Sequence, residues 1–547
     1  MPPVTPALPA RPPRHGLSRR GVVLGGLAVL PLLSACTFDS AGPSDSEPQE
    51  APRTQTAAPA GPVALAADAV SASALLFTAA PLVVVVEDVP ASVLLAAQVS
   101  IAWGVPLLVE GAASPATASP SPSASPSASP IDAELARLGA SRILAVGAVA
   151  EHAGVESVSA AVDAAAIEEA TGVSVGALDV AGLIALAPGA PADPPFGALP
   201  ARAEPLTGVT ALAQAADASA MANARAAGVP VTLVADGVTD LLASGPAVTA
   251  IADASAACTL LLGPVLAAQS LPDWSVRAAA SGWQLPGGGQ RLFGGHLFVA
   301  IYGTPGAPVL GVLGEQGLDA TIARAEAVAE PYRSLTDLQV VPSLEIITTV
   351  AAGSAGGDGD YSNELDAAGI RPYIDAAAAA GMYVVLDLQP GRSDFLSQAQ
   401  AYEELLRLPN VGLALDPEWR LAPDEVPLAQ IGRVEAAEVD SVSTWLADLV
   451  QSAGLPPKMF VLHQFRLSML QDRESIRRDR PELEFLIHVD GQGGQPDKQA
   501  TWNALHEGAP EGIAWGWKNF YDEDLPMLTP AETMSEVAPL PDLVTYQ

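Results

Sequence analysis

The sequence is poor in several residue types and motifs, and each shortage narrows the functions it can have. Only two cysteines are present, Cys36 and Cys258, which excludes a metal site built on cysteines. Basic residues are also few: 26 Lys and Arg stand against 61 Asp and Glu, for a formal net charge of -35. This balance argues against nucleic acid as a partner and against a cationic surface that adheres to membranes. No strand-like run is followed by a G-x-G-x-x-G pattern, so we expect no dinucleotide and no other cofactor.

What remains is the composition of a globular protein. Hydrophobic residues make up 49% of the 547 residues, and charged residues make up 16%. A chain of this length usually forms about two to four domains. Runs typical of strands alternate with runs typical of helices along most of the sequence, which predicts an α/β fold.

The first 36 residues have the layout of a lipoprotein export signal. A stretch with four arginines precedes an apolar run at residues 21–33, which is too short to be read as a spanning helix. Leu-Ser-Ala-Cys at residues 33–36 resembles the bacterial lipobox, which implies that Cys36 becomes a lipidated N-terminus. Ser-Arg-Arg at residues 18–20 resembles a twin-arginine signal, so Sec and twin-arginine export both stay open.

These features predict a protein held by its lipid at the outer face of the cell membrane. Lipidation of Cys36 would leave Cys258 without a disulfide partner, and we expect Cys258 to be a buried, inert thiol. Residues 37–62 are rich in Ser, Pro, Glu and Ala, which predicts a disordered tether.

Residues 63–265 are expected to form a parallel, three-layer α/β region. A Ser/Pro/Ala-rich insertion at residues 114–130 interrupts it, and residues 266–295 form an irregular junction to the next domain. Strands are predicted at residues 82–87, 105–109 and 142–147, and helices at residues 92–103 and 132–138.

This region resembles the cell-wall-binding repeat 2 family of Gram-positive surface proteins. The matching segments are Ala-Ala at 96–97, Gly-Val-Pro-Leu-Leu-Val at 104–109, Leu-Ala-Arg-Leu-Gly at 135–139 and Ile-Leu-Ala-Val-Gly at 143–147. Residues 218–234 look like a second, degenerate copy, in which Gly-Val-Pro recurs at 228–230. The resemblance implies association with peptidoglycan or another wall polymer, while an ordinary α/β scaffold remains the alternative.

Residues 296–547 have the length and rhythm of a (β/α)8 barrel, with an open doubly wound sheet as the alternative. Strands are predicted at residues 297–302, 344–350, 383–389, 411–416, 459–463, 483–489, 512–517 and 543–546. The clearest helices are predicted at residues 318–332, 374–380, 397–408, 439–453, 473–480 and 498–505.

Polar and aromatic residues gather where most of these strands end, which is where barrel enzymes build their sites. The residues concerned are Tyr302, Asp387, Gln389, Asp416, Glu418, His463, His488, Asp490, Trp515, Trp517 and Lys518. Glu345 is an exception, because it lies early in its strand. Since side chains alternate along a strand, Asp416 and Glu418 are expected to face the same way; the alternative is that Asp416 caps the next turn and Glu418 is solvated.

Several carboxyl groups at one end of a barrel predict glycoside hydrolysis. That reaction needs one protonated carboxyl for the leaving oxygen and one ionised carboxylate as nucleophile or base. Asp-Pro-Glu at residues 416–418 resembles the short Asp-x-Glu that ends the fourth strand of glycoside hydrolase family 25 lysozymes. The resemblance implies that Glu418 is the acid and that Asp416 supports it, with Asp416 or Asp387 as nucleophile or base. The early Asp of that family's first strand is absent here.

The remaining candidate residues are expected to bind substrate. His488 and Asp490 would orient it or tune charge, and Trp419, Trp515 and Trp517 would offer flat faces for sugar rings. Gln389, His463, Lys518 and Tyr302 complete the expected contacts.

Two other functions remain open from the sequence. A metal-dependent hydrolase or deacetylase could use His463, His488 and the nearby aspartates, although no H-x-H or H-E-x-x-H spacing supports a metal and none is predicted. A wall-polysaccharide-binding lipoprotein with an inactive barrel is the other possibility.

Overall fold

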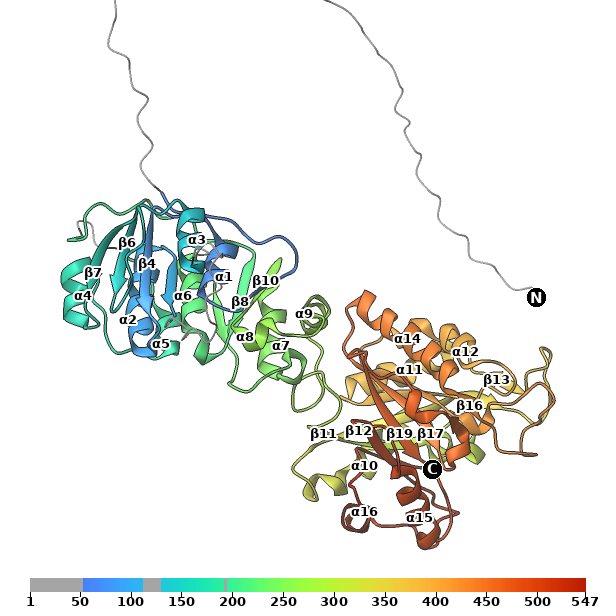
Figure 1. The fold of residues 1–547 in the computed structure, drawn as a ribbon. Coiled ribbons are helices and arrows are strands. Elements are labelled where there is room, and N and C mark those ends of the chain that lie inside the picture. Colours follow the sequence, from blue (N-terminus) through green and yellow to red (C-terminus); the bar gives the residue numbers. More distant parts are fainter. Residues whose placement is uncertain (1–52, 112–128, 191–193) are drawn as a thin grey trace, which may run out of the picture. The chain divides into compact units, whose positions relative to one another are not determined.

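A computed structural model describes residues 53–111, 129–190 and 194–547 of the chain (Figure 1). The expected lipobox with Cys36, most of the tether and most of the low-complexity insertion lie outside these ranges. No helix in the described ranges combines the length and the apolar character needed to cross a membrane.

The N-terminal part of the described chain contains two four-stranded parallel sheets. The first has the order β5-β4-β6-β7, and the second has the order β9-β8-β10-β2. The strands of the first sheet are β4 (Leu82–Glu87), β5 (Leu107–Glu110), β6 (Arg142–Val146) and β7 (Glu156–Ala160). Those of the second are β2 (Val63–Ala66), β8 (Val209–Ala213), β9 (Val231–Leu233) and β10 (Cys258–Leu262).

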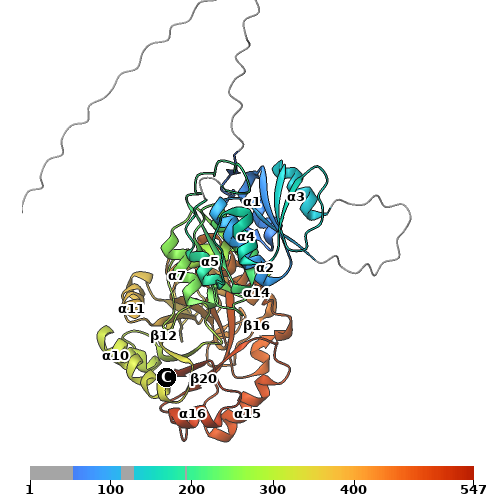
Figure 2. The same cartoon turned by 90° about the vertical axis from the view of Figure 1, so that its left-hand side faces the viewer.

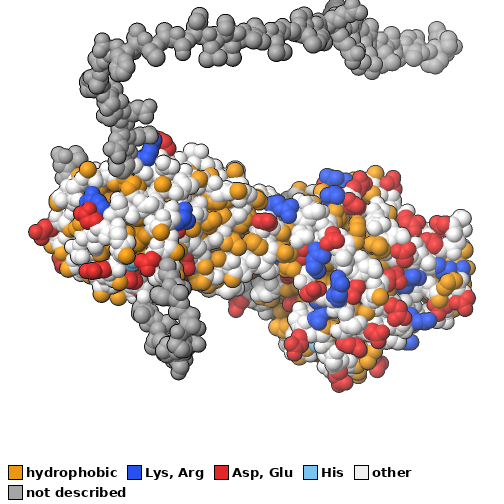
Figure 3. All heavy atoms as spheres, turned by 45° about the horizontal axis from the view of Figure 1, so that its top comes forward, with side chains coloured by type: hydrophobic (Ala, Val, Ile, Leu, Met, Phe, Trp, Pro, Cys, Tyr) orange, Lys and Arg blue, Asp and Glu red, His pale blue; other side chains and the backbone are white. Residues whose placement is uncertain are grey.

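Helices connect the strands of both sheets. They are α1 (Ala69–Leu76), α2 (Pro90–Trp103), α3 (Pro130–Leu138), α4 (Ala164–Thr171), α5 (Val180–Ala185), α6 (Ala218–Ala226) and α7 (Gly245–Ala254). The three strands and two helices predicted between residues 82 and 147 are all present, with ends displaced by up to two residues. Charged side chains are sparse on the face of this part that Figure 3 shows.

The two sheets repeat one topology. If the strands are numbered from β4 in the first sheet and from β8 in the second, both sheets have the strand order 2-1-3-4. In the second sheet the fourth strand is β2, which comes from earlier in the chain. Gly104 after α2 and Gly228 after α6 both have positive φ, and the prolines two residues later accept equivalent hydrogen bonds of 2.9 Å from Val84 N and Ala211 N. The repeat suggested by the two Gly-Val-Pro segments is therefore present in the backbone.

Three expected boundaries differ from the structure. Residues 55–56 were assigned to the tether but form β1 (Gln55–Thr56), which pairs with β3 (Phe77–Ala79). Pro130 was assigned to the insertion but begins α3, where its missing N–H costs nothing. The junction contains two helices, α8 (Pro264–Ala267) and α9 (Pro272–Ala280). Composition identified the breaks but not the pairing and capping at their edges.

The C-terminal part is a closed barrel of eight parallel strands. Around the barrel the order is β11-β21-β20-β19-β17-β15-β14-β12, and β12 pairs with β11 to close it. The strands are β11 (His296–Gly303), β12 (Gln339–Ala351), β14 (Tyr383–Leu388), β15 (Val411–Leu415), β17 (Lys458–Gln464), β19 (Leu483–Val489), β20 (Ala514–Asn519) and β21 (Leu543–Tyr546). All eight predicted strands are confirmed, and the open sheet is excluded.

Helices lie around the outside of the strands (Figure 2). They are α10 (Leu318–Ala329), α11 (Ala367–Ala379), α12 (Phe395–Ala401), α13 (Glu403–Leu406), α14 (Ala436–Ala453), α15 (Gln495–His506) and α16 (Pro530–Glu536). The face of the barrel seen in Figure 3 carries many acidic and basic side chains.

The helix expected at residues 473–480 is absent, and this prediction was wrong. The segment forms only a short 3₁₀ turn, η8 (Arg473–Ser475). Arg473 is buried and donates to Gln464 Oε1 at 2.9 Å, and Ile476 is buried in the core. These tertiary contacts override the helix propensity of the segment.

The interior of the barrel changes character along its axis. Alternate residues of a strand share a face, so Phe298 and Ala300 of β11 join Tyr383 in an apolar layer near the amino ends of the strands. Tyr302, one more pleat along, reaches the polar layer near the carboxyl ends. The apolar layer thus provides a rigid floor beneath the polar side chains.

Candidate active site at the carboxyl end of the barrel

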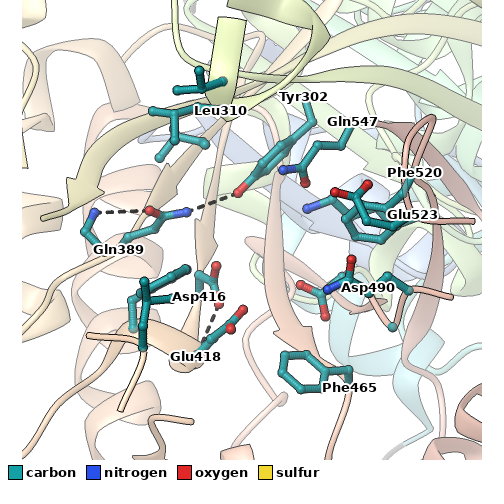
Figure 4. A pocket seen from close by; sticks show the side chains of 18 residues that line it. Tyr302, Leu310, Gln389, Asp416, Glu418, Phe465, Asp490, Phe520, Glu523 and Gln547 are labelled. Atoms are coloured by element: carbon teal, nitrogen blue, oxygen red, sulfur yellow. Dashed lines mark hydrogen bonds between the residues drawn. The ribbon is translucent and has the colours of Figure 1, made fainter. Parts of the chain in front are cut away.

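A cavity of about 350 Å³ opens at the carboxyl ends of the strands (Figure 4). The candidate residues that line it are Tyr302, Gln389, Asp416, Glu418, Trp419, Asp490 and Lys518. They come from five strand ends, so closure of the barrel is what brings them together. In Figure 4, Asp416 and Glu418 lie on one side of the cavity, and Asp490, Phe520 and Glu523 lie on the other.

Asp416 and Glu418 both line the cavity, but not for the expected reason. Strand β15 ends at Leu415, and Asp416 begins the 3₁₀ turn η6 (Pro417–Trp419). Asp416 Oδ1 accepts a hydrogen bond of 3.1 Å from Glu418 N–H, so Asp416 caps the turn. The prediction from strand alternation was wrong, whereas the capping role for Asp416 is confirmed.

The carboxyl groups around the cavity favour different protonation states. Burial, with the nearby charge of Asp490, raises the pKa of Glu418 to about 7. Burial also raises the pKa of Asp416 well above its usual range, a shift that His463 opposes. The pKa of Asp490 is instead lowered, because its hydrogen bond to His463 and the positive charges nearby outweigh its burial. The cavity therefore faces a Glu418 that keeps its proton up to about pH 7 and an Asp490 that is already ionised there.

A second group of polar residues lies beneath the cavity. Tyr302 O–H donates to Asp387 Oδ2 at 2.7 Å, and Gln389 Nε2 donates to the Tyr302 oxygen at 3.3 Å. Lys518 Nζ lies 3.5 Å from the centroid of the Tyr302 ring, within reach of a cation–π interaction. Burial raises the pKa of Asp387 to about 6, despite the opposing charge of His463. These contacts fix the Tyr302 ring as part of the cavity wall.

Five predicted site residues lie outside the cavity lining. Asp387, His463 and His488 have no exposed surface and belong to the layer below, so direct roles as nucleophile or substrate contact are excluded for them in this conformation. Trp515 and Trp517 pack with Trp502 between β20 and α15. Because side chains alternate along β20, Lys518 faces the barrel interior while the two tryptophans face the helices. Their expected role as sugar platforms was wrong.

Several residues of the site were not predicted. Glu345 lies midway along β12, fully buried, with Oε1 2.8 Å from His463 Nε2. Further lining residues are Leu310, Phe465, Phe520, Glu523 and Gln547. Val309 and Leu428 also line the cavity and are 92% and 86% exposed, which leaves apolar side chains at its mouth. A single charge inside an apolar strand, as at Glu345, was the signal that could have indicated an inward-facing polar layer.

Two sets of three residues are close enough to face one divalent ion: Glu345, His463 and His488, and Asp416, His463 and Asp490. Both sets require a ring nitrogen of His463. Its Nδ1 lies 2.9 Å from Asp490 Oδ2 and its Nε2 lies 2.8 Å from Glu345 Oε1, so both nitrogens already have carboxylate partners. Both nitrogens of His463 are thus engaged by carboxylates, which argues against a metal at this ring, although both ring nitrogens of the buried His488 have no hydrogen-bond partner among the described residues.

Comparisons with protein-family models, curated proteins and solved structures found no match for this chain. The function must therefore be argued from the geometry of the site.

Proposed function

We propose that the C-terminal part is a TIM-type (β/α)8 glycoside hydrolase that acts on a cell-wall or other extracellular polysaccharide. The observation that carries the proposal is the pairing across one cavity of Glu418, with its pKa raised to about 7, and Asp490, with its pKa lowered. Cleavage of an acetal requires this combination of a protonated and an ionised carboxyl group.

In the proposed reaction, Glu418 is the general acid. Its proton passes to the glycosidic oxygen as the bond to the anomeric carbon breaks, and water adds its hydroxyl to that carbon. The water's other proton passes to a carboxylate of the pair, which restores Glu418 to its protonated form by the end of the cycle. Asp490 serves as the ionised carboxylate, in place of Asp387, which does not reach the cavity. Asp416 supports Glu418 by accepting its backbone N–H.

The cavity walls suit a carbohydrate. Trp419, Phe465 and Phe520 offer apolar faces for sugar rings, while Gln389 and Gln547 add amide groups. Carboxylates outnumber the single lysine among the lining residues, so a neutral polymer fits better than a phosphate-rich one.

The resemblance of the N-terminal part to wall-binding repeats and the expected export signal support an activity at the cell surface. We propose that the repeated α/β sheets associate with peptidoglycan or a related wall polymer, as their resemblance to cell-wall-binding repeats implies. Cys36 would carry the lipid that holds the protein at the outer face of the membrane, after export by the Sec or twin-arginine route.

Release of reducing ends from purified peptidoglycan and arabinogalactan-type polymers tests the proposal. The protein would lack residues 1–36 but keep every residue that the structure describes. Wild type should release reducing ends, and Glu418→Gln should lose about 100- to 10,000-fold in rate. Glu403→Gln is the matched control, because Glu403 is an exposed partner of Arg407 on α13.

Binding without hydrolysis by wild type would reject the enzyme and leave a wall-binding lipoprotein. Equal activity of wild type and Glu418→Gln would reject Glu418 as the acid.

A further inference from the structure

A row of three charged side chains crosses the buried interior of the barrel beneath the cavity. It runs from Glu345 on β12 through His463 on β17 to Asp490, which follows β19. His463 Nε2 lies 2.8 Å from Glu345 Oε1, and His463 Nδ1 lies 2.9 Å from Asp490 Oδ2. The exposed fractions of the three side chains are 1%, 0% and 6%. Only Asp490 reaches the cavity lining.

These distances, together with the lowered pKa values of Glu345 and Asp490, indicate two protons on His463, because two ionised carboxylates can only accept hydrogen bonds. A neutral imidazole has one N–H and one acceptor nitrogen, so it can donate to only one carboxylate. Here both ring nitrogens lie at hydrogen-bond distance from carboxylate oxygens. A lone pair on either nitrogen would face an oxygen lone pair, whereas an imidazolium donates to both.

The charges around His463 support the cationic form. Glu345 and Asp490, whose pKa values are lowered, are the ionised partners. Asp387 Oδ1, which lies 3.9 Å from His463 Nε2, and the nearby Asp416 and Glu418 add negative charge only when they lose their protons, because burial raises their pKa values. The ring of His488, whose pKa is lowered by burial, has its centroid 4.7 Å from that of His463, the Tyr302 ring lies 6.0 Å away, and Lys518 is the positive charge near Asp490. His488 Nδ1 is 3.6 Å from Glu345 Oε2, which also accepts from Thr545 Oγ1 at 3.3 Å. Carboxylates thus dominate the surroundings of His463.

We propose that Glu345 and His463 are positioning residues, which hold Asp490 ionised and in a fixed orientation at the cavity. The role rests on the proposed glycosidase function, because Asp490 is its ionised carboxylate. Glu345 keeps His463 protonated, and the protonated His463 stabilises the Asp490 carboxylate through Oδ2. Asp490 Oδ1 is buried and has no hydrogen-bond partner in the described part of the chain, so the hydrogen bond from His463 to Oδ2 is the one that stabilises this carboxylate.

The arrangement predicts how charge removal spreads along the row. In Glu345→Gln the His463 imidazolium loses one of its two anionic partners, so its pKa falls and it becomes neutral nearer pH 7. Asp490 then loses its cationic partner, and its pKa rises. Because Asp490 must be ionised to act, the acidic limb of the pH–rate profile should move up by about one to two pH units.

The first test reads the protonation of His463 directly and needs no activity. The chain lacking residues 1–36 keeps five of the six histidines, and ¹⁵N-histidine NMR resolves their ring nitrogens. His152→Gln, His296→Gln and His506→Gln assign three signals by elimination, which leaves His463 and His488. His488→Gln separates the last two, and at pH 7.5 His463 should be an imidazolium with both nitrogens protonated, while His488 should be neutral. Two neutral rings, or one equivalent of tightly bound divalent metal in the purified protein, would overturn the proposal.

The second test follows the acidic limb of kcat/KM in wild type, Glu345→Gln and the control Thr545→Val. Thr545→Val removes an uncharged hydrogen bond to the same carboxylate, so it should leave the limb in place. If the acidic limb of kcat/KM in Glu345→Gln lies at the same pH as in wild type, and only kcat or thermal stability is reduced, then Glu345 has a structural role alone and the proposal is overturned. Absence of hydrolysis by wild type would instead reject the glycosidase, and the NMR result would still decide the state of His463.

Discussion

The segments that follow β19 and β20 both contribute to the cavity wall and are joined by one buried ion pair, which makes a specific prediction about stability. Lys498 Nζ lies 2.9 Å from Asp524 Oδ2, and the two side chains are 2% and 0% exposed. The ammonium also donates to Gly491 O at 2.8 Å and to Lys518 O at 2.6 Å, so all three of its protons have acceptors. Asp524 accepts in turn from the N–H groups of Phe520 and Gly493.

Replacing Lys498 by Met should therefore be costly. It leaves the Asp524 carboxylate buried without its cation, and breaking one partner of a buried pair typically costs about 3–5 kcal/mol. For a domain of this size that loss lowers Tm by about 6–20 °C. Because Asp490 and Phe520 lie on the two joined loops, substrate binding should weaken as well.

Chemical denaturation of wild type, Lys498→Met and Lys498→Met/Asp524→Leu measures the effect. The double variant should recover part of the loss, because it removes the stranded charge. Arg371→Met is the control: it breaks an exposed pair with Asp375 and should cost less than about 1 kcal/mol. A similarly small cost for Lys498→Met would refute the assignment of Lys498 and Asp524 as a desolvated pair.

Three further predictions concern the site and the N-terminal sheets. The pKa of Glu418 is raised to about 7, and the protonated form is the active one, so kcat should fall as the pH rises through about 7. A kcat that stays constant across this pH range would contradict the prediction. A Cβ on Gly263 would lie 2.1 Å from the Asp217 carboxylate, so Gly263→Ala should lower Tm clearly more than Gly237→Ala, which has the same φ of +88° but open space around it. Trp419→Ala should raise KM about 2- to 10-fold, because Trp419 lines the cavity. Trp515→Ala should instead lower the free energy of unfolding by about 3–5 kcal/mol and leave KM unchanged. Steady-state kinetics and thermal unfolding measure the two effects, and the opposite pattern would show that the two tryptophans are misassigned.

Much of the fold is predictable from the sequence, because buried parallel strands leave a strong local signal. Most barrel strands contain an apolar run, and burial on both faces explains why, for example, Val411–Leu415 contains no polar residue. The absent helix at residues 473–480 shows the limit: Arg473 and Ile476 are held by distant partners that no local pattern reveals.

The candidate site was predictable only in part for the same reason. Polar residues that follow a strand, such as Asp416 and Asp490, mark the end of the barrel that holds the cavity. The direction of each side chain depends on the pleat, which separates Lys518 in the cavity from Trp517 in the outer core. Glu345 was missed because its importance comes from His463, which lies 118 positions away in the sequence.

Hydrolysis of a wall polysaccharide in H₂¹⁸O tests the central claim most directly, with mass spectrometry of the products. If the barrel is a glycoside hydrolase, each cleaved bond should place one ¹⁸O at the new anomeric hydroxyl, and Glu418→Gln should abolish this labelling. Label that appears in released acetate, with the glycan chains intact, would contradict the account and identify a deacetylase instead.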